Sequence, residues 1–162
     1  MPIAVVTGAS SGLGRAYALA AMKVFPEIDE YWLIARRLDR LEKLKAEMPG
    51  KTVRCVPLDL SSEEGLDELE RLLAERGEKI ALLVNNAGLG WMGDFAEGSW
   101  RSQTAMVDVN VRAMTAVANI SLKHMERGSV MVNVSSIAAF APTPRMAVYC
   151  STKAYVSSLS KA

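Results

Sequence analysis

The chain has 162 residues, of which 50% are hydrophobic and 23% are charged, and its formal net charge is +1. This composition is typical of a globular protein with a sizeable core, and the length fits a single domain. The near-neutral charge does not indicate a nucleic-acid-binding or membrane surface, and no apolar run approaches the roughly 20 residues of a membrane span.

Few side chains of the kinds that bind metals or carry redox chemistry are present. The two cysteines are Cys55 and Cys150, and the one histidine is His124. They show no metal-ligand spacing, so no metal site is expected. Two reduced thiols, and an N-terminus that runs directly into a strand, favour a cytoplasmic protein without a signal peptide.

The start of the chain predicts a strand, a glycine-rich loop and a helix. Residues Ile3–Thr7 form a short β-branched run that fits a buried strand, and residues 15–24 are rich in good helix formers. The glycines between them, spaced Gly-x-x-x-Gly-x-Gly, let the backbone approach a pyrophosphate at a helix N-terminus. An ordinary Gly/Ser turn is the alternative. The loop residues expected to contact a dinucleotide are Gly8, Ser10, Ser11, Gly12, Leu13 and Gly14.

The rest of the chain continues to alternate strands with helices. Strands are expected at 31–35, 52–58, 80–84 and 129–134, and helices at 38–47, 61–76, 99–125 and around Tyr149. Such alternation implies a parallel sheet with helices on both faces. We therefore predict an α/β fold over residues 1–162, a Rossmann-like doubly wound sheet of strand order 3-2-1-4-5. Ligands bind such a sheet at the switch point between strands one and four.

The residues after the second strand bear on the choice between NAD(H) and NADP(H). Folds that prefer NAD place an acidic residue there to bond the ribose 2′-hydroxyl, whereas this chain has Arg36 and Arg37. A guanidinium binds a 2′-phosphate with paired hydrogen bonds, so NADP(H) is expected to be preferred. The alternative is that both arginines simply begin a solvated helix.

Two further strand ends carry candidate cofactor contacts. Asp59 follows the third strand, where it could also act as a helix cap, as could Ser61 or Ser62. Asn86, Ala87 and Gly88 follow the fourth strand at the expected switch point. Small residues there let the backbone pass close to a ligand.

Tyr149 and Lys153 are the candidate reactive pair. They lie four residues apart, about one helical turn, so both side chains project from the same face of a helix. An ammonium beside a phenol favours the phenolate, which makes the phenol usable as a proton donor and acceptor near neutral pH.

The motifs together resemble a known family. Thr7–Gly14, Asn85–Gly88, Asn110, Ser136 and Tyr149-x-x-x-Lys153 stand in the order typical of short-chain dehydrogenases/reductases, and Ser136 lies 13 residues before Tyr149, the usual family offset. These are NAD(P)-dependent oxidoreductases on a Rossmann fold, and the resemblance covers the whole chain. Arg36 stands where NAD-preferring members usually carry Asp, but Ser11 stands where some NADP-preferring members carry a basic residue.

The resemblance also implies roles for individual residues. Tyr149 would be the general acid or base, and Ser136 would bond the substrate oxygen; Ser135 competes, but period-two alternation turns it the other way. Lys153 would assist Tyr149 and hold the nicotinamide ribose, and Asn110 would position a water linking Lys153 to solvent. Asp59 would accept a bond from the adenine amine. The implied substrate is a small carbonyl or alcohol.

The chain departs from the family pattern at its end. It stops at Ala162 on the expected Tyr149 helix, whereas family members continue, so we expect the domain to be C-terminally incomplete. The intact protein is expected to be a homo-oligomer, a dimer or tetramer. Segments 89–94 and 137–145 are expected to line part of the substrate pocket, whose apolar side chains favour a partly hydrophobic substrate. The alternatives are a catalytically idle nucleotide-binding or interaction fragment and, disfavoured by the glycine spacing, an epimerase or dehydratase.

Overall fold

The computed structural model describes residues 2–77 and 79–162. The expected strands and helices are present with bounds that differ by a few residues, except that the helix expected over 99–125 is divided. The strands are β1 (Ile3–Thr7), β2 (Glu30–Ala35), β3 (Thr52–Pro57), β4 (Ile80–Asn85) and β5 (Val130–Asn133). The helices are α1 (Gly12–Val24), α2 (Leu38–Ala46), α3 (Glu63–Arg76), α4 (Trp100–Val107), α5 (Met114–Leu122) and α6 (Ala147–Leu159), with a π-helical turn η1 (Asp108–Ala113) and a 3-10 turn η2 (Ile137–Ala139).

The strands form one parallel sheet in the order β3-β2-β1-β4-β5, which confirms the predicted fold. β1 is fully buried at the centre of the sheet, with Val5 opposite Trp32 of β2 on one side and Leu83 of β4 on the other. Because the chain turns toward β2 after β1 and later returns on the other side to β4, the switch point lies at the carboxyl ends of β1 and β4.

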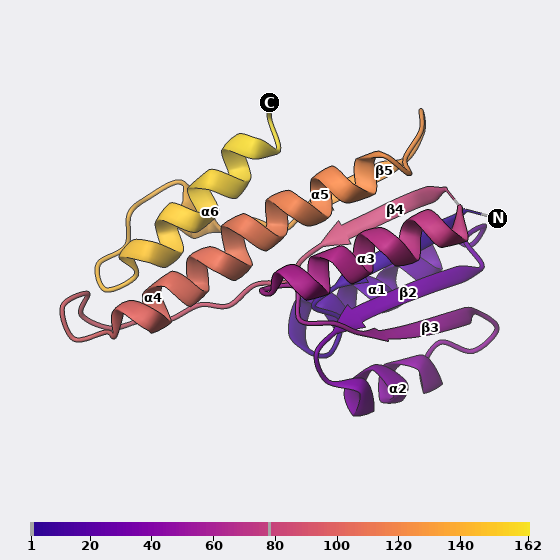
Figure 1. Ribbon diagram of the computed structural model, residues 1–162, viewed down its shortest axis with the longest axis horizontal. Coiled ribbons are helices and arrows are strands. Elements are labelled where there is room, and N and C mark those ends of the chain that lie inside the picture. Colours follow the sequence, from indigo (N-terminus) through magenta and orange to yellow (C-terminus); the bar gives the residue numbers. More distant parts are fainter. Residues whose placement is uncertain (1, 78) are drawn as a thin grey trace.

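Two hydrophobic cores lie on opposite faces of the sheet. Side chains of β1 alternate between them: Val5 packs with α3 and α5 on one face, and Val6 packs with α1 and α2 on the other. Figure 1 shows α3 in front of the strands and α1 behind them, with α4 and α6 at the left of the view, beyond the arrowhead of β4. Of the candidate catalytic residues, α6 carries Tyr149 and Lys153.

Local capping sets the start of α3. The hydroxyl of Ser62 accepts a hydrogen bond from the Gly65 N–H at 3.0 Å and so caps the helix. The Asp59 carboxylate instead accepts bonds from the N–H and the hydroxyl of Ser61, at 3.0 and 2.6 Å. Of the three capping candidates, Ser62 therefore caps α3, and the Asp59 side chain stays at the carboxyl end of β3.

The helix expected over residues 99–125 is interrupted. α4 and α5 are joined by the π-helical turn η1, in which each backbone hydrogen bond spans one residue more than in an α-helix. Asn110 lies in this turn, fully buried, and its amide reaches out of the helix to the Leu89 backbone. Sequence periodicity did not indicate the π turn, because the contact that accompanies it is made to a distant loop.

The described part of the chain shows neither a membrane-spanning helix nor a metal-binding cluster. Within residues 2–77 and 79–162, none of the helices has the length and hydropathy needed to span a membrane. In the same residues no group of three His, Cys, Asp or Glu side chains is placed to hold a metal ion. Cys55 and Cys150 are both free thiols.

Candidate active site

The glycine-rich loop lies at the carboxyl end of β1, and α1 begins directly on it. A Cβ atom at position 14 would lie 2.2 Å from the Gly8 carbonyl oxygen and 2.6 Å from the Asn86 amide nitrogen. Gly8 itself has φ +66°, a left-handed conformation that glycine adopts without strain. Only glycine at position 14 lets the first turn of α1 approach the strand end this closely.

Hydrogen bonds of Thr7 join the ends of β1 and β4 at the switch point. Its hydroxyl accepts hydrogen bonds from the N–H groups of Asn86 and Ala87, both at 2.9 Å. The Asn86 amide in turn donates to the Thr7 carbonyl at 3.1 Å. No separate role for Thr7 was expected from the sequence, in which the available signal is a hydroxyl that ends an otherwise apolar strand.

A cavity of about 180 Å³ opens at this switch point. It gathers residues from the ends of β1, β2, β3 and β4. The predicted cofactor contacts that line it are Gly8, Ser10, Ser11, Arg36, Arg37, Asp59, Ala87 and Gly88. Gly14 and Asn86 lie behind Gly8, and Gly12 and Leu13 do not line the cavity; the Leu13 side chain is largely exposed.

The charges around this cavity are arranged for a ligand with both a phosphate and a polar ring. The Arg37 guanidinium lies 3.3 Å from the Ser10 hydroxyl, at the edge of the glycine-rich loop. Hydrogen bonds from the Ser61 hydroxyl and N–H, and the charge of Arg36, lower the pKa of the Asp59 carboxyl below its usual value. An ionised acceptor, two guanidiniums and a close glycine cradle fit a dinucleotide.

Tyr149 and Lys153 share one face of α6, as expected. The Lys153 ammonium lies 5.8 Å from the centre of the Tyr149 ring, and it donates to the Val134 carbonyl at 2.8 Å. Only 5% of Lys153 is exposed, and this burial lowers the pKa of its ammonium below the usual value. A Cβ atom at position 88 would lie 3.7 Å from the lysine nitrogen. Lys153 therefore lies between the candidate phenol and the loop that follows β4.

Asn110 joins that loop to α6. Its side-chain oxygen accepts from the Leu89 N–H at 2.9 Å, and its nitrogen donates to the Leu89 carbonyl at 2.8 Å and to the Thr152 hydroxyl at 3.1 Å. The oxygen keeps a second lone pair. The role of Asn110 in positioning a water stays a prediction.

Ser135 and Ser136 face different surroundings. The Ser135 hydroxyl bonds the Lys153 carbonyl at 2.8 Å and the Ser157 hydroxyl at 2.7 Å, so it serves the packing of α6. The Ser136 hydroxyl accepts from the Ala138 N–H at 3.2 Å and caps η2, which packs against α6. An accepting hydroxyl can still donate its own proton to a ligand. Of the two hydroxyls, that of Ser135 is bonded to α6 and that of Ser136 to the backbone of η2.

A parallel sheet in this order, with a glycine cradle and a cationic wall at its switch point, defines a dinucleotide-binding protein of the Rossmann type. A family model described as short chain dehydrogenase matches residues 2–162. The chain therefore belongs to the short chain dehydrogenase family of oxidoreductases, which confirms the resemblance seen in its motifs. Members of this family use nicotinamide cofactors and act on small molecules.

Individual relatives align with nearly the whole of this chain and are longer than it. Sulfoacetaldehyde reductase of Chromohalobacter salexigens is 36% identical over 96% of this chain and 62% of its own length. 17-beta-hydroxysteroid dehydrogenase type 3 of Mus musculus is 32% identical over 98% of this chain and 53% of its own length. A crystal structure of an alcohol dehydrogenase from Thermococcus sibiricus, complexed with 5-hydroxy-NADP, has a TM-score of 0.89 at 30% identity, covering 99% of this chain and 69% of that one. The chain thus spans about half to two thirds of the length of these proteins.

Proposed function

We propose that this chain carries the cofactor site and the proton-transfer residues of an NADP(H)-dependent oxidoreductase that interconverts a carbonyl and an alcohol. The observation that carries the proposal is the position of Lys153. Its buried ammonium lies beside the Tyr149 ring and beside the backbone at Gly88, and so links a phenol to the dinucleotide cavity. Because burying a cation costs free energy, a buried ammonium beside a phenol and a ligand cavity supports a functional role in addition to its hydrogen bond to the Val134 carbonyl.

The protein's part in the reaction is proton transfer and orientation. The nicotinamide, when bound, supplies the hydride to the carbonyl carbon or accepts it from the alcohol. In the reducing direction Tyr149 gives its hydroxyl proton to the substrate oxygen, and Lys153 stabilises the phenolate that remains. The Ser136 hydroxyl donates a hydrogen bond to the same oxygen, where negative charge develops. In the oxidising direction the phenolate takes the proton back.

The names of the relatives support this reaction class. They describe an aldehyde reductase, a hydroxysteroid dehydrogenase and an alcohol dehydrogenase, whose chemistry in each case is at a carbonyl or hydroxyl group. The test is a titration of the chain with NADPH followed by nucleotide fluorescence, and then a screen of carbonyl compounds followed by the absorbance of the reduced nicotinamide. We expect saturable binding and turnover. Binding without turnover would instead support an idle nucleotide-binding fragment.

The preference for NADP(H) rests on Arg36 and Arg37, which line the dinucleotide cavity at the end of β2. We expect Arg36→Ala to weaken NADPH binding by about 10- to 100-fold, the range of a lost charge-assisted hydrogen bond, and to leave NADH binding unchanged. Arg40→Ala is the matched control, since Arg40 is exposed on α2 and does not line the cavity. If Arg36→Ala weakened the binding of NADPH and NADH equally, Arg36 would not be the residue that recognises the 2′-phosphate.

Two expectations about the whole protein stay predictions. The cytoplasmic location is one. The other is that the intact protein is a homo-oligomer, a dimer or tetramer.

A further inference from the structure

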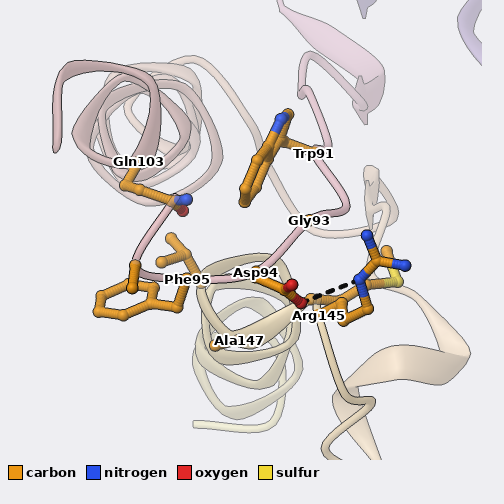
Figure 2. Close-up of a pocket in the computed structure, with 10 residues that line it drawn as sticks. Trp91, Gly93, Asp94, Phe95, Gln103, Arg145 and Ala147 are labelled. Carbon is orange, nitrogen blue, oxygen red and sulfur yellow. Dashed lines mark hydrogen bonds and ion pairs between the residues drawn. The ribbon is translucent and has the colours of Figure 1, made fainter. Parts of the chain in front are cut away.

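A second cavity lies close to the candidate catalytic residues. Its volume is about 240 Å³, and we call it the loop cavity because the loop between β4 and α4 forms one wall. The starts of α4 and α6 form the others. Figure 2 shows Trp91 and Phe95 from the loop, Gln103 from α4 and Arg145 before α6 arranged around it.

Two walls of the loop cavity adjoin residues near Tyr149, although Tyr149 itself does not line the cavity. Trp91 directly follows Gly90, and a Cβ atom at position 90 would lie 3.2 Å from two carbons of the Tyr149 ring. On the other wall, Met146 lines the cavity one residue before α6 begins, three residues before Tyr149. A substrate whose reacting oxygen lies at Tyr149 would therefore extend toward this cavity.

The Gln103 amide is an unpaired donor in the wall of the loop cavity. The residue is 7% exposed, and its Nε2 is buried without a hydrogen-bond partner among residues 2–77 and 79–162. Such a group is rare in a folded protein, because a buried donor without an acceptor costs about 1–3 kcal/mol. Gly98 makes room for it, since a Cβ atom there would lie 2.4 Å from this nitrogen. The last torsion of a glutamine is soft, so rotation can turn the amide N–H groups toward a ligand.

The other side chains that line the loop cavity carry no net charge. Trp91, Phe95 and Met146 are apolar, while Asp94 and Arg145 pair with each other at 3.1 Å. The Arg145 carbonyl also accepts from the Gly93 N–H at 2.9 Å, and Arg145 has φ +65°, a strained conformation for a residue with a side chain. These two interactions join the loop before α4 to the loop before α6. A ligand therefore meets apolar walls and one neutral donor, without an uncompensated charge.

We propose that the loop cavity receives the end of the substrate remote from its reacting carbonyl, and that this end is an uncharged, bulky apolar group bearing one hydrogen-bond acceptor for Gln103. The inference rests on the proposed function and narrows its substrate class. It disfavours substrates with an anionic far end, because the one arginine of the cavity is already paired with Asp94. Gln103 then determines specificity without taking part in the chemistry.

The test compares two ketones of equal size that differ in one acceptor. One is cyclohexanone carrying a para-methoxyphenyl group at its far carbon, and the other carries para-ethylphenyl. Each is titrated calorimetrically into the chain saturated with NADP⁺, so that no turnover follows. We expect the methoxy ketone to bind about 5-fold more tightly, the worth of one neutral hydrogen bond. Gln103→Leu should remove this difference, and Thr104→Val, at the exposed next residue, should keep it.

The fold of the variant is checked in the same samples. Gln103→Leu removes an unpaired buried donor, so its Tm should be unchanged or higher; if it does not fold, Gln103→Met replaces it. The proposal is wrong if the unaltered chain binds both ketones equally, if it binds neither, or if the difference survives in the variant. Failure of NADP⁺ to bind would overturn the proposed function instead. The ketones would then be titrated without nucleotide, and their ratio would still decide the role of Gln103.

Discussion

Tyr149→Phe is expected to lower kcat for carbonyl reduction by about 10²–10⁴-fold, the usual contribution of a positioned proton donor. The ring stays, so the packing of Gly90 against it and the neighbouring Lys153 stay as well. Only the hydroxyl proton is lost. NADPH affinity should change little, because the dinucleotide cavity is built from the strand ends and not from this ring. Steady-state kinetics and a nucleotide titration on the same preparation measure both quantities.

A second tyrosine of α6 offers a matched control. The Tyr155 hydroxyl bonds that of Thr115 at 2.7 Å, on the side of the helix that packs toward α5. Tyr155→Phe removes the same atom from the same helix and should leave kcat nearly unchanged. If Tyr149→Phe kept full turnover, or if both variants lost it equally, the assignment of Tyr149 as proton donor would be wrong.

The fold was predictable because its signals are local. Each central strand is a short run of buried apolar residues between turn residues, and α3 is preceded by a serine that caps it. The start of α1 was placed too late, at residue 15, since glycines at the start of a helix lower its propensity. α1 nevertheless starts at Gly12, and Gly14 lies in its first turn, close against the Gly8 carbonyl.

The remaining features depend on contacts between distant residues. The Asn110 amide bonds Leu89 and Thr152, which lie 21 and 42 residues away, and neither pairing leaves a periodic trace in the sequence. The same is true of Ser135, whose bond to the Lys153 carbonyl shows which strand-end serine serves the packing. The unpaired Gln103 amide appears only when Gly98 and Trp91 are in place around it. The sequence motifs thus predicted the candidate residues. The contacts in the folded structure then showed which of two neighbouring serines bonds to α6.

Gly14→Ala is expected to reduce the free energy of unfolding by about 3 kcal/mol, at the upper end of the usual cost of overpacking. The added methyl would lie 2.2 Å from the Gly8 carbonyl oxygen, which is backbone and cannot rotate away. Alanine gains about 1 kcal/mol of helix propensity over glycine, which offsets only part of this clash. Because α1 must move off the loop, NADPH binding should weaken by at least about 10-fold, equivalent to about 1.4 kcal/mol. Urea unfolding and a nucleotide titration measure the two effects.

Two other glycines separate the clash from simple backbone strain. Gly12 and Gly50 have φ of +55° and +78°, and neither position has an atom within 4 Å of an added Cβ. Alanine at either should cost about 1–2 kcal/mol through the left-handed backbone alone. Gly50 lies in the turn before β3, outside the dinucleotide cavity, so Gly50→Ala should leave NADPH binding unchanged. If Gly14→Ala were no more destabilising than these two variants, the close approach of α1 to β1 would not be the reason for glycine at position 14.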